Sequence, residues 1–184
     1  QRGEIIAARI QSGENCAIVT DAGMPAISDP GEDLVRLCHE LSIPVESVPG
    51  PTAFATALAL SGMEVGRFTF EGFLSVSKKS RREHLEDIVN ERRTMVFYEA
   101  PHKLCNTLAD LYKYLGDREI AIVREITKIH EEVIKTTLSQ AVAMYETEKP
   151  KSEYVLVIAG KKEKKEDITL DNAVKMAQSL VDDG

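Results

Sequence analysis

The feature that most constrains the fold of this chain is the alternation of short apolar runs with amphipathic segments, joined by short turns. Residues 16–20 (CAIVT) and 44–48 (PVESV) read as short strands, and a helical pattern follows each of them. Helices that connect neighbouring strands in this order are typical of parallel sheets. The first third of the chain therefore predicts a parallel α/β sheet.

Start and stop signals support the helices of this segment. Residues 4–12 read as one helix. Asp29 is expected to cap the next helix, and Thr52 to cap a helix of small residues that ends at Gly62. The helix after Asp29 has one apolar face, made of Leu34, Leu37, Cys38 and Leu41.

The pattern changes after residue 66, where a second set of elements begins. Strands are expected at residues 68–74, 94–99, 119–126, 131–136 and 154–159, and helices after the basic run 78–82, from Pro101 and at 138–145. We therefore expect two α/β lobes, residues 1–66 and 67–160, followed at 161–184 by a charged linker and the start of a C-terminal helical extension. Because Gln1 lies directly in a helical pattern, the N-terminal lobe is expected to be truncated at its start.

Composition excludes several classes of protein. With 43% hydrophobic and 29% charged residues the sequence is that of an ordinary globular protein, and no apolar run reaches the roughly 20 residues that span a bilayer. No signal peptide is recognisable, which predicts a cytoplasmic protein. Cys16, Cys38 and Cys105 lack the spacing of a zinc or redox site, so we expect buried thiols and no metal.

The formal net charge of −7 limits how the chain can contact nucleic acid. Phosphate-binding proteins usually present a basic face, so any RNA contact is expected to be local or to lie partly outside this chain. The densest basic run before the tail supplies four cations, Lys78, Lys79, Arg81 and Arg82. These cations are the candidates for RNA binding, and a role in solubility alone is the alternative.

Four segments at expected strand ends could carry chemistry, namely residues 20–31, 49–57, 96–102 and 124–128. Ligands of open α/β sheets bind beyond the carboxyl ends of strands, and helix N-termini attract anions. Each segment also has a structural explanation: a tight turn, close helix–sheet packing, a packed aromatic ring, or a solvated charged surface. The residues alone leave these alternatives open. The sequence contains no GxGxxG, P-loop or GxSxG motif, which disfavours nicotinamide enzymes, P-loop NTPases and α/β-hydrolases.

Five collinear blocks resemble the tetrapyrrole methylase superfamily. They are VTDAGMPAISDPG, VPGPTAFATAL, FTFEGFL with the following KKSRRE, MVFYEAPHKL and IVREITKIHEE, within about Ile18 to Gly160. Relatives that make tetrapyrroles typically carry Gly-Asp-Pro where this chain has Gly23-Met24-Pro25. The SDPG and FYEAPH sequences are similar instead to the branch that methylates ribosomal RNA. That branch usually has threonine at the position of Met24, so a backbone contact is expected there.

The resemblance implies a two-lobed class III S-adenosylmethionine methyltransferase fold with the methyl donor between the lobes. It also implies a homodimer that methylates a cytidine 2′-hydroxyl in 16S ribosomal RNA of the 30S subunit. The donor contacts that it implies are Ala22, Gly23, Met24, Ile27, Thr52, Ala53, Tyr98, Glu99 and Ile126, with Glu153 and Tyr154 as weaker candidates. The family's first strand and its threonine-proline-isoleucine-glycine loop would precede Gln1, so this chain is expected to hold part of the site.

The group that takes the proton of the ribose hydroxyl is open among three candidates, Glu99, Glu125 and Lys128. Two other functions also stay open. One is a corrin or porphyrin C-methyltransferase, which the missing Gly-Asp-Pro aspartate disfavours. The other is a non-catalytic module that binds the ribosome or RNA.

Overall fold

The computed structural model describes residues 2–162 and residue 178, and its centre is one five-stranded sheet. The strands run in the order β1-β2-β5-β3-β4, with bounds β1 Phe68–Gly72, β2 Thr94–Glu99, β3 Glu119–Arg124, β4 Glu132–Thr137 and β5 Tyr154–Ile158. β1 and β2 are parallel, whereas β5 and β4 run antiparallel to their neighbours. The sheet is therefore mixed, with its one parallel pair at an edge.

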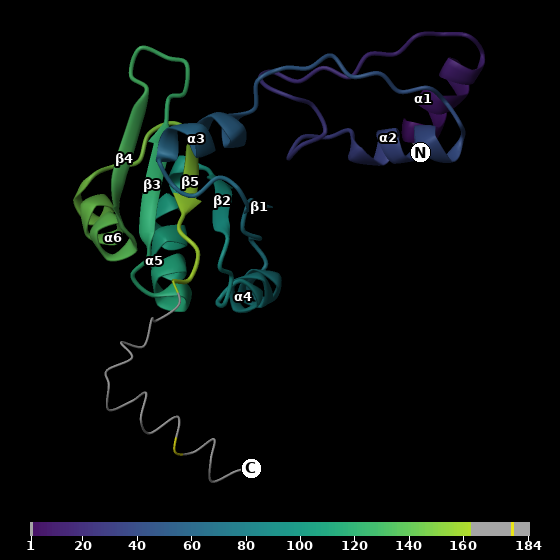
Figure 1. Cartoon of the computed structure of the whole chain (residues 1–184). Helices are drawn as coiled ribbons and strands as arrows, with labels where there is room; N and C mark the ends of the chain where they lie inside the picture. The colour runs from purple at the N-terminus through teal and green to yellow at the C-terminus, as the bar shows by residue number, and fades with distance from the viewer. Residues whose placement is uncertain (1, 163–177, 179–184) are drawn as a thin grey trace.

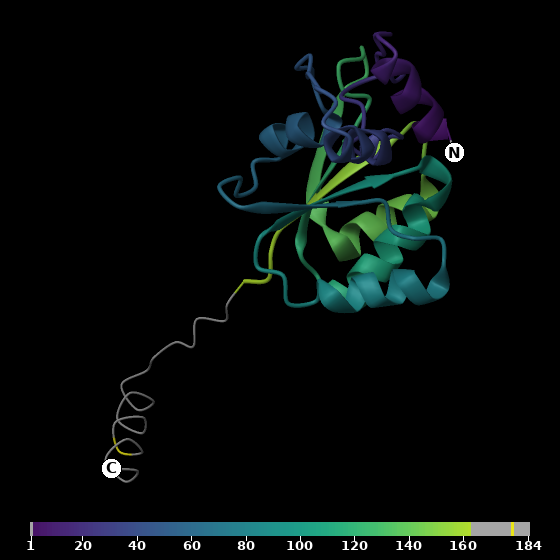
Figure 2. The ribbon, with the colours of Figure 1, turned by 90° about the vertical axis from the view of Figure 1, so that its right-hand side faces the viewer.

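Helices cover both faces of this sheet (Figures 1 and 2). The short apolar helix α3 (Ala53–Ser61) lies on one face, against β2, β5 and β3. The other face is covered by α4 (Lys78–Asp87), α5 (Leu104–Leu115) and α6 (Leu138–Thr147), with a single 3-10 turn, η1 (Pro101–Lys103), before α5. We call these the α3 face and the α5 face.

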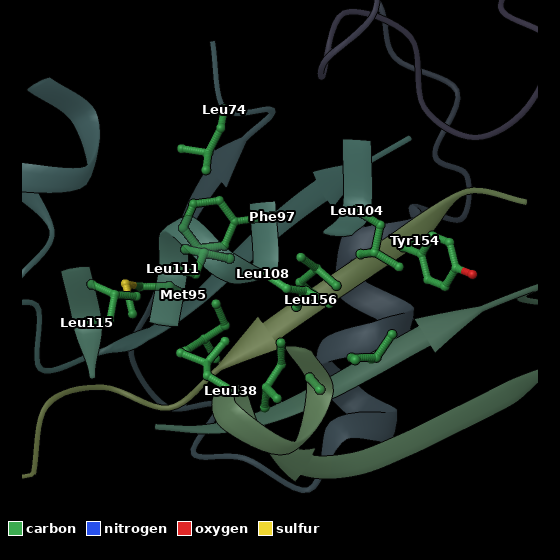
Figure 3. Close-up of a cluster of buried hydrophobic side chains, with 14 of the residues drawn as sticks. Leu74, Met95, Phe97, Leu104, Leu108, Leu111, Leu115, Leu138, Tyr154 and Leu156 are labelled. Atoms are coloured by element: carbon green, nitrogen blue, oxygen red, sulfur yellow. The ribbon is translucent and has the colours of Figure 1, made fainter. Parts of the chain in front are cut away.

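The α5 face carries the larger hydrophobic core (Figure 3). Alternation along β2 divides its side chains between the two faces, as the pleat of a strand requires. Met95 and Phe97 enter the core of the α5 face, and Val96 and Tyr98 pack on the α3 face. The leucines of α5 follow helical spacing and fill the same core, with Leu104, Leu108 and Leu111 fully buried.

The first two helices form a separate unit. α1 (Arg2–Gln11) and α2 (Glu32–Glu40) pack against each other, and Figure 1 shows the pair set apart from the sheet. Their shared cluster holds three buried residues, Ala7, Cys38 and Ile43. This small cluster contrasts with the long apolar core of the sheet.

Two predicted strands are wrong. Residues 16–20 and 44–48 follow an irregular course without ladder pairing, and Val19 and Val48 are 84% and 89% exposed. A strand forms only where a neighbour takes up its backbone hydrogen bonds, and the described residues provide none for these two runs. The parallel sheet predicted for the first third of the chain is therefore absent from the described residues.

Several local predictions also need correction. Asp29 does not cap α2, whose N-cap is Gly31, and instead accepts a hydrogen bond from Thr20 Oγ1 at 3.2 Å. Thr52 occupies the N-cap position of α3, but its side chain makes no capping bond. Of the three free cysteines only Cys38 is buried, while Cys16 and Cys105 are exposed.

The elements predicted after residue 66 are confirmed. The predicted strand 94–99 is found with the same bounds, and the other strands and helices agree to within a few residues. Gly62 ends α3 in the left-handed region, as predicted. The division into lobes at residue 66 stays a prediction, and α3, from the first predicted lobe, packs directly on the sheet of the second.

The tail predicted as a linker and helix lies outside the described residues, apart from Lys161, Lys162 and Gln178. Among the described residues, no helix is long and apolar enough to cross a membrane.

Candidate functional site

Helix α3 begins at the edge of the sheet where β1, β2 and β3 end. The Phe54 backbone N–H, in the first turn of α3, donates to the Tyr98 hydroxyl at 3.0 Å. Tyr98 comes one residue before the end of β2, so this bond ties the helix start to the sheet. Partial burial is the main reason that the pKa of the Tyr98 hydroxyl is raised, so the hydroxyl stays protonated at neutral pH.

The loop of residues 20–31 lies beside the same strand ends. A Cβ placed on Gly23 would lie 3.5 Å from the carbonyl oxygen of Pro51, in the turn before α3. A Cβ placed on Gly72, the last residue of β1, would lie 3.8 Å from Ser28 Oγ. The structure thus brings the first two predicted segments together, at the end of the sheet that carries Tyr98.

The backbone of this loop is held in an unusual conformation. Gly23, Ala26, Ser28 and Gly31 all have positive φ, at 78°, 66°, 62° and 144°. Two of these four residues carry a side chain, for which the left-handed region costs roughly 1 kcal/mol or more. Strain of this kind is concentrated at functional sites, so it agrees with a ligand-binding role for the loop.

The third part of the site is the connection between β3 and β4. Ile126 packs partly buried on the α3 face together with Tyr98. Its neighbours Glu125 and Thr127 both have positive φ, at 53° and 66°. Lys128 donates to Glu125 Oε1 at 2.9 Å, which lowers the pKa of the Glu125 carboxyl. A turn with two positive-φ residues and an ion pair therefore holds Ile126 on the α3 face.

Glu99 lies on the opposite side of the sheet from Tyr98. Its side chain is 1% exposed, and its two oxygens accept hydrogen bonds from the Ala100 N–H at 2.8 Å and from Thr107 Oγ1 at 2.5 Å. Tyr154 is buried on the same α5 face. The carboxylate of Glu99 thus anchors the start of α5, and only the backbone of Glu99 lies at the strand end with Tyr98.

The basic run at the start of α4 divides into two parts. Arg81 is folded inward, with Nε 2.7 Å from Asp110 Oδ2 and a second bond of 2.9 Å to Thr107 Oγ1. Lys78, Lys79 and Arg82 are exposed. Lys79 and Arg82 form loose pairs with acids one turn further on, at 3.8 Å and 3.7 Å. Three of the four predicted RNA-binding cations therefore face solvent.

A histidine fixes the same helix to β1. Nε2 of His84 lies 2.8 Å from Glu71 Oε2, and this hydrogen bond is the main reason that the pKa of the Glu71 carboxyl is lowered. The contact joins α4 to the strand whose last residue, Gly72, approaches the loop of residues 20–31. Helix α4 is thus fixed at two points, to β1 through His84 and to α5 through Arg81.

Sequence reasoning missed an aromatic cluster at this end of the sheet. Phe70 lies between Phe54 and Tyr98, with ring centroids 4.7 Å and 5.1 Å away, and the ring centroid of Phe73 lies 5.6 Å from that of Tyr98. The signal for it is the recurrence of phenylalanine in FTFEGF, a pattern that also predicts the strand. The cluster joins α3 to β1 and β2 at the end of the sheet that carries Tyr98.

Two surface depressions lie elsewhere, at the other end of the sheet. One of about 510 Å³ is lined by Arg67, Asp87, Asn90, Glu91, Arg92 and Arg93, and one of about 220 Å³ by residues around Arg118 and Gly160. Neither contains a residue predicted to bind the donor. We place the site at the carboxyl ends of β1 and β2 despite them, because ligands of open α/β sheets bind there. Among the described residues no group of histidine, cysteine and acidic side chains could hold a metal ion.

The sequence and the fold agree on the class of protein. Residues 1–142 match the family described as tetrapyrrole (corrin/porphyrin) methylases. The chain belongs to this family.

Within the family, several relatives carry one name. Ribosomal RNA small subunit methyltransferase I of Synechocystis sp. is 46% identical over 160 residues, which cover 86% of this chain and 57% of that relative. The protein of the same name from Thermotoga maritima is 45% identical over 83% of this chain and 68% of its own length. The Escherichia coli O157:H7 protein is 40% identical over 93% and 61%. The chain spans little more than half the length of the first of these relatives.

Solved structures of more distant proteins show the same fold. The methyltransferase CobJ superposes with a TM-score of 0.64 at 18% identity, over 86% of this chain and 70% of CobJ. A uroporphyrin-III C-methyl transferase from Thermus thermophilus, complexed with S-adenyl homocysteine, gives a TM-score of 0.55 at 17% identity, over 84% and 70%. These likenesses confirm the predicted class III methyltransferase fold.

Proposed function

We propose that the protein is an S-adenosylmethionine-dependent methyltransferase that modifies a cytidine 2′-hydroxyl in 16S ribosomal RNA of the 30S subunit. The observation that carries the proposal is the 46% identity over 86% of the chain to a ribosomal RNA small subunit methyltransferase I. A ribosomal substrate would support the predicted cytoplasmic location. The family resemblance supports a homodimer, which sedimentation of the whole protein would test.

The residues at the carboxyl ends of the strands fit the methyl donor. The Thr52 side chain makes no cap, and Tyr98 takes only the Phe54 N–H of the first turn of α3. The remaining N–H groups at this helix start suit the donor's carboxylate. Gly23 lies against the turn at Pro51, and its neighbours Ala22 and Met24 are exposed and half-buried. Ile27 is 39% exposed and Ile126 is half-buried, so both can contribute apolar walls. Ala53 is exposed beside Thr52.

When bound, the donor supplies a methyl group on a positively charged sulfur that leaves as a neutral thioether. The chain's own contribution is to hold donor and hydroxyl in line, since positioning provides most of the acceleration in such a transfer. The hydroxyl proton also needs an acceptor, which adds about 10²- to 10⁴-fold. Glu125 lies on the turn that presents Ile126 and is ionised at neutral pH, while its bond to Lys128 lowers the pKa of its carboxyl and makes it a weaker base. The carboxylate of Glu99 is already occupied on the α5 face, so we propose Glu125 as the acceptor, with Lys128 holding it.

Calorimetry with S-adenosylmethionine tests the donor site in the whole protein. Gly23→Val adds bulk to a left-handed residue that faces the Pro51 carbonyl, and Thr52→Arg fills the start of α3. Both are expected to abolish binding while the circular dichroism spectrum is retained. The matched control is Gly66→Val, because a Cβ at Gly66 meets no atom within 4 Å and the residue lies outside the site. Unchanged affinity in both site variants would place the donor elsewhere.

Methylation assays test the acceptor. Unmethylated 30S subunits are expected to accept a labelled methyl group from the donor, and uroporphyrinogen-type tetrapyrroles are not. Methylation of the tetrapyrrole alone would replace the proposal by a C-methyltransferase. Absence of donor binding in the unaltered protein would indicate a non-catalytic module that binds the ribosome.

A further inference from the structure

Phe73 owes its position to a bulge at the end of β1. Phe70 pairs with Val96 and Gly72 pairs with Phe97, so Glu71 is an extra residue between two ladder positions. Gly72 has a φ of 63°, which favours glycine at such a bulge. One extra residue reverses the alternation, because successive side chains of a strand point to opposite faces. Phe73 therefore returns to the face of Phe70 and lies beside Tyr98.

The ring of Phe73 is half covered and half in solvent. It contacts Tyr98 on one side and remains 50% exposed, while the next residue, Leu74, is buried in the core of the α5 face. Phe73 is thus held from one side, against Tyr98, which is a predicted donor contact. An aromatic ring fixed in this way offers a flat surface at little further entropic cost.

Cations follow directly after the ring in the chain. Residues 75–77 lead from β1 into α4, and the exposed side chains of Lys78 and Lys79 stand in its first turn. Lys78 has no ion-pair partner among residues 2–162. A half-exposed aromatic ring followed closely by exposed cations is the arrangement that binds single-stranded nucleic acid, with bases on the ring and phosphates on the cations. The charge complements RNA locally, although the chain as a whole is acidic.

We propose that Phe73 is a stacking platform for one unpaired base of the RNA substrate, next to the donor site, with Lys78 and Lys79 on the adjoining phosphates. The inference rests on the proposed function, which supplies the RNA. Ribose methylation needs a nucleotide that the enzyme can reach, and single-stranded RNA is recognised largely by stacking its splayed bases on aromatic side chains. Stacking does not distinguish bases, so Phe73 would orient the nucleotide without selecting its sequence.

Binding of unmethylated 30S subunits to the whole protein measures the contribution of the ring. Phe73→Ala is expected to weaken binding about 5- to 150-fold, the factor that corresponds to loss of one base–aromatic stack. The log–log salt slope should stay unchanged, because no phosphate contact is removed. Phe73→Trp should restore the affinity, since tryptophan also stacks. Val76→Ala is the matched control, because Val76 is a 78% exposed apolar residue of the same loop, and it should change affinity less than about twofold.

Phe73→Trp also gives a direct signal, since these 184 residues contain no tryptophan. Its fluorescence, measured against the unaltered protein, should be quenched by a single-stranded oligoribonucleotide and not by the same strand made abasic. Equal losses of affinity in Phe73→Ala and Val76→Ala, without quenching, would show a protein contact and overturn the inference. Loss of S-adenosylmethionine affinity with unchanged 30S affinity would assign the ring to the donor's adenine instead.

The two proposals fail separately. If the unaltered protein methylates 30S subunits and Phe73→Ala binds them as tightly, the stacking inference is wrong and the proposed function stands. If the unaltered protein neither binds nor methylates them, the proposed function is wrong and the inference is wrong with it.

Discussion

Residues 2–52 and residues 53–162 are built from similar sequence patterns and fold very differently. Both contain short apolar runs between helices, yet all five strands of the described sheet come from the second region. The first region buries three residues in its own cluster, whereas the core of the α5 face alone contains seventeen. Residues 2–52 also hold two of the non-glycine residues with positive φ around the candidate site, Ala26 and Ser28.

The difference shows that apolar runs specify a strand only when a neighbouring strand completes its hydrogen bonds. Residues 154–158 form a strand because β2 and β3 pair with them on both sides. Residues 16–20 have a similar composition and no such neighbours among the described residues. We infer that the sheet region supplies stability and that the first region supplies much of the predicted ligand contact.

The largest effect is expected from Gly160→Ala, at the end of the sheet region. A Cβ at Gly160 would lie 1.8 Å from the carbonyl oxygen of Arg92, a distance that no side-chain movement relieves. The backbone would have to separate, and the Lys161 N–H to Glu91 oxygen bond of 2.7 Å would break. We expect a loss of at least about 4 kcal/mol in the free energy of unfolding, at the upper end for a single substitution. Urea denaturation followed by circular dichroism measures it.

Gly66→Ala provides the control for this prediction. A Cβ there meets no atom within 4 Å, and φ is not positive, so the change should be within about 0.5 kcal/mol of zero. Equal stabilities of the two variants would show that residues 90–92 and 160 do not pack closely, and would weaken the account of the sheet region as the rigid part.

The next largest effect distinguishes the two regions directly. Leu108→Ala removes a fully buried side chain of the sheet region and should cost about 2–5 kcal/mol. Ile43→Ala truncates one of three residues in the small cluster of the first region and should change the unfolding of the sheet by less than about 1 kcal/mol. Hydrogen exchange should show the lost protection confined to α1 and α2. If Ile43→Ala destabilises the sheet as much as Leu108→Ala does, the two regions fold as one unit.

The sequence predicted the sheet region well because its signals are local. The segment 94–99 (TMVFYE), with its apolar centre, defines β2 with correct bounds, and glycines mark the ends of α3 and α5. The strand order could not be predicted, because β5 pairs between β2 and β3 although β4 and α6 separate it from β3 in the sequence. Pairing of residues distant in sequence depends on the assembled core and leaves no short-range pattern.

The candidate site was predicted in part. The structure brings together Gly23, Thr52, Tyr98 and Ile126 at one end of the sheet, although their roles in donor binding stay predictions. It also separates the side chains of Glu99 and Tyr98, as strict alternation along a strand requires, although the resemblance implied donor contacts for both. The position of Phe73 depends on a single extra residue in β1, a detail that apolar patterning does not show.

The smallest effects are expected within the basic run of α4, where one side chain belongs to the folded core and three belong to the surface. Arg81 is 16% exposed and bridges Asp110 and Thr107, whose hydroxyl in turn donates to Glu99. Arg81→Ala would leave the Asp110 carboxylate and this network without their cation, at a cost of about 1–3 kcal/mol in stability. The replacement of Lys78, Lys79 and Arg82 together by alanine should cost less than about 1 kcal/mol, since it removes only two exposed ion pairs.

Binding to 30S subunits over a range of salt concentrations should give the reverse ranking. Each lost phosphate contact lowers the log–log slope by roughly 0.7–0.9, so the triple alanine variant should flatten it by as much as about 2–3. Arg81→Ala should leave the slope unchanged below its unfolding transition, because its guanidinium is already held by Asp110. Affinity for S-adenosylmethionine should be the same in both variants, since phosphate contacts position the RNA and do not form the donor site.

A flatter slope in Arg81→Ala alone would mean that Arg81 leaves Asp110 to bind RNA, and that α4 rearranges on the ribosome. An unchanged slope in the triple variant would assign the phosphate contacts to other parts of the protein.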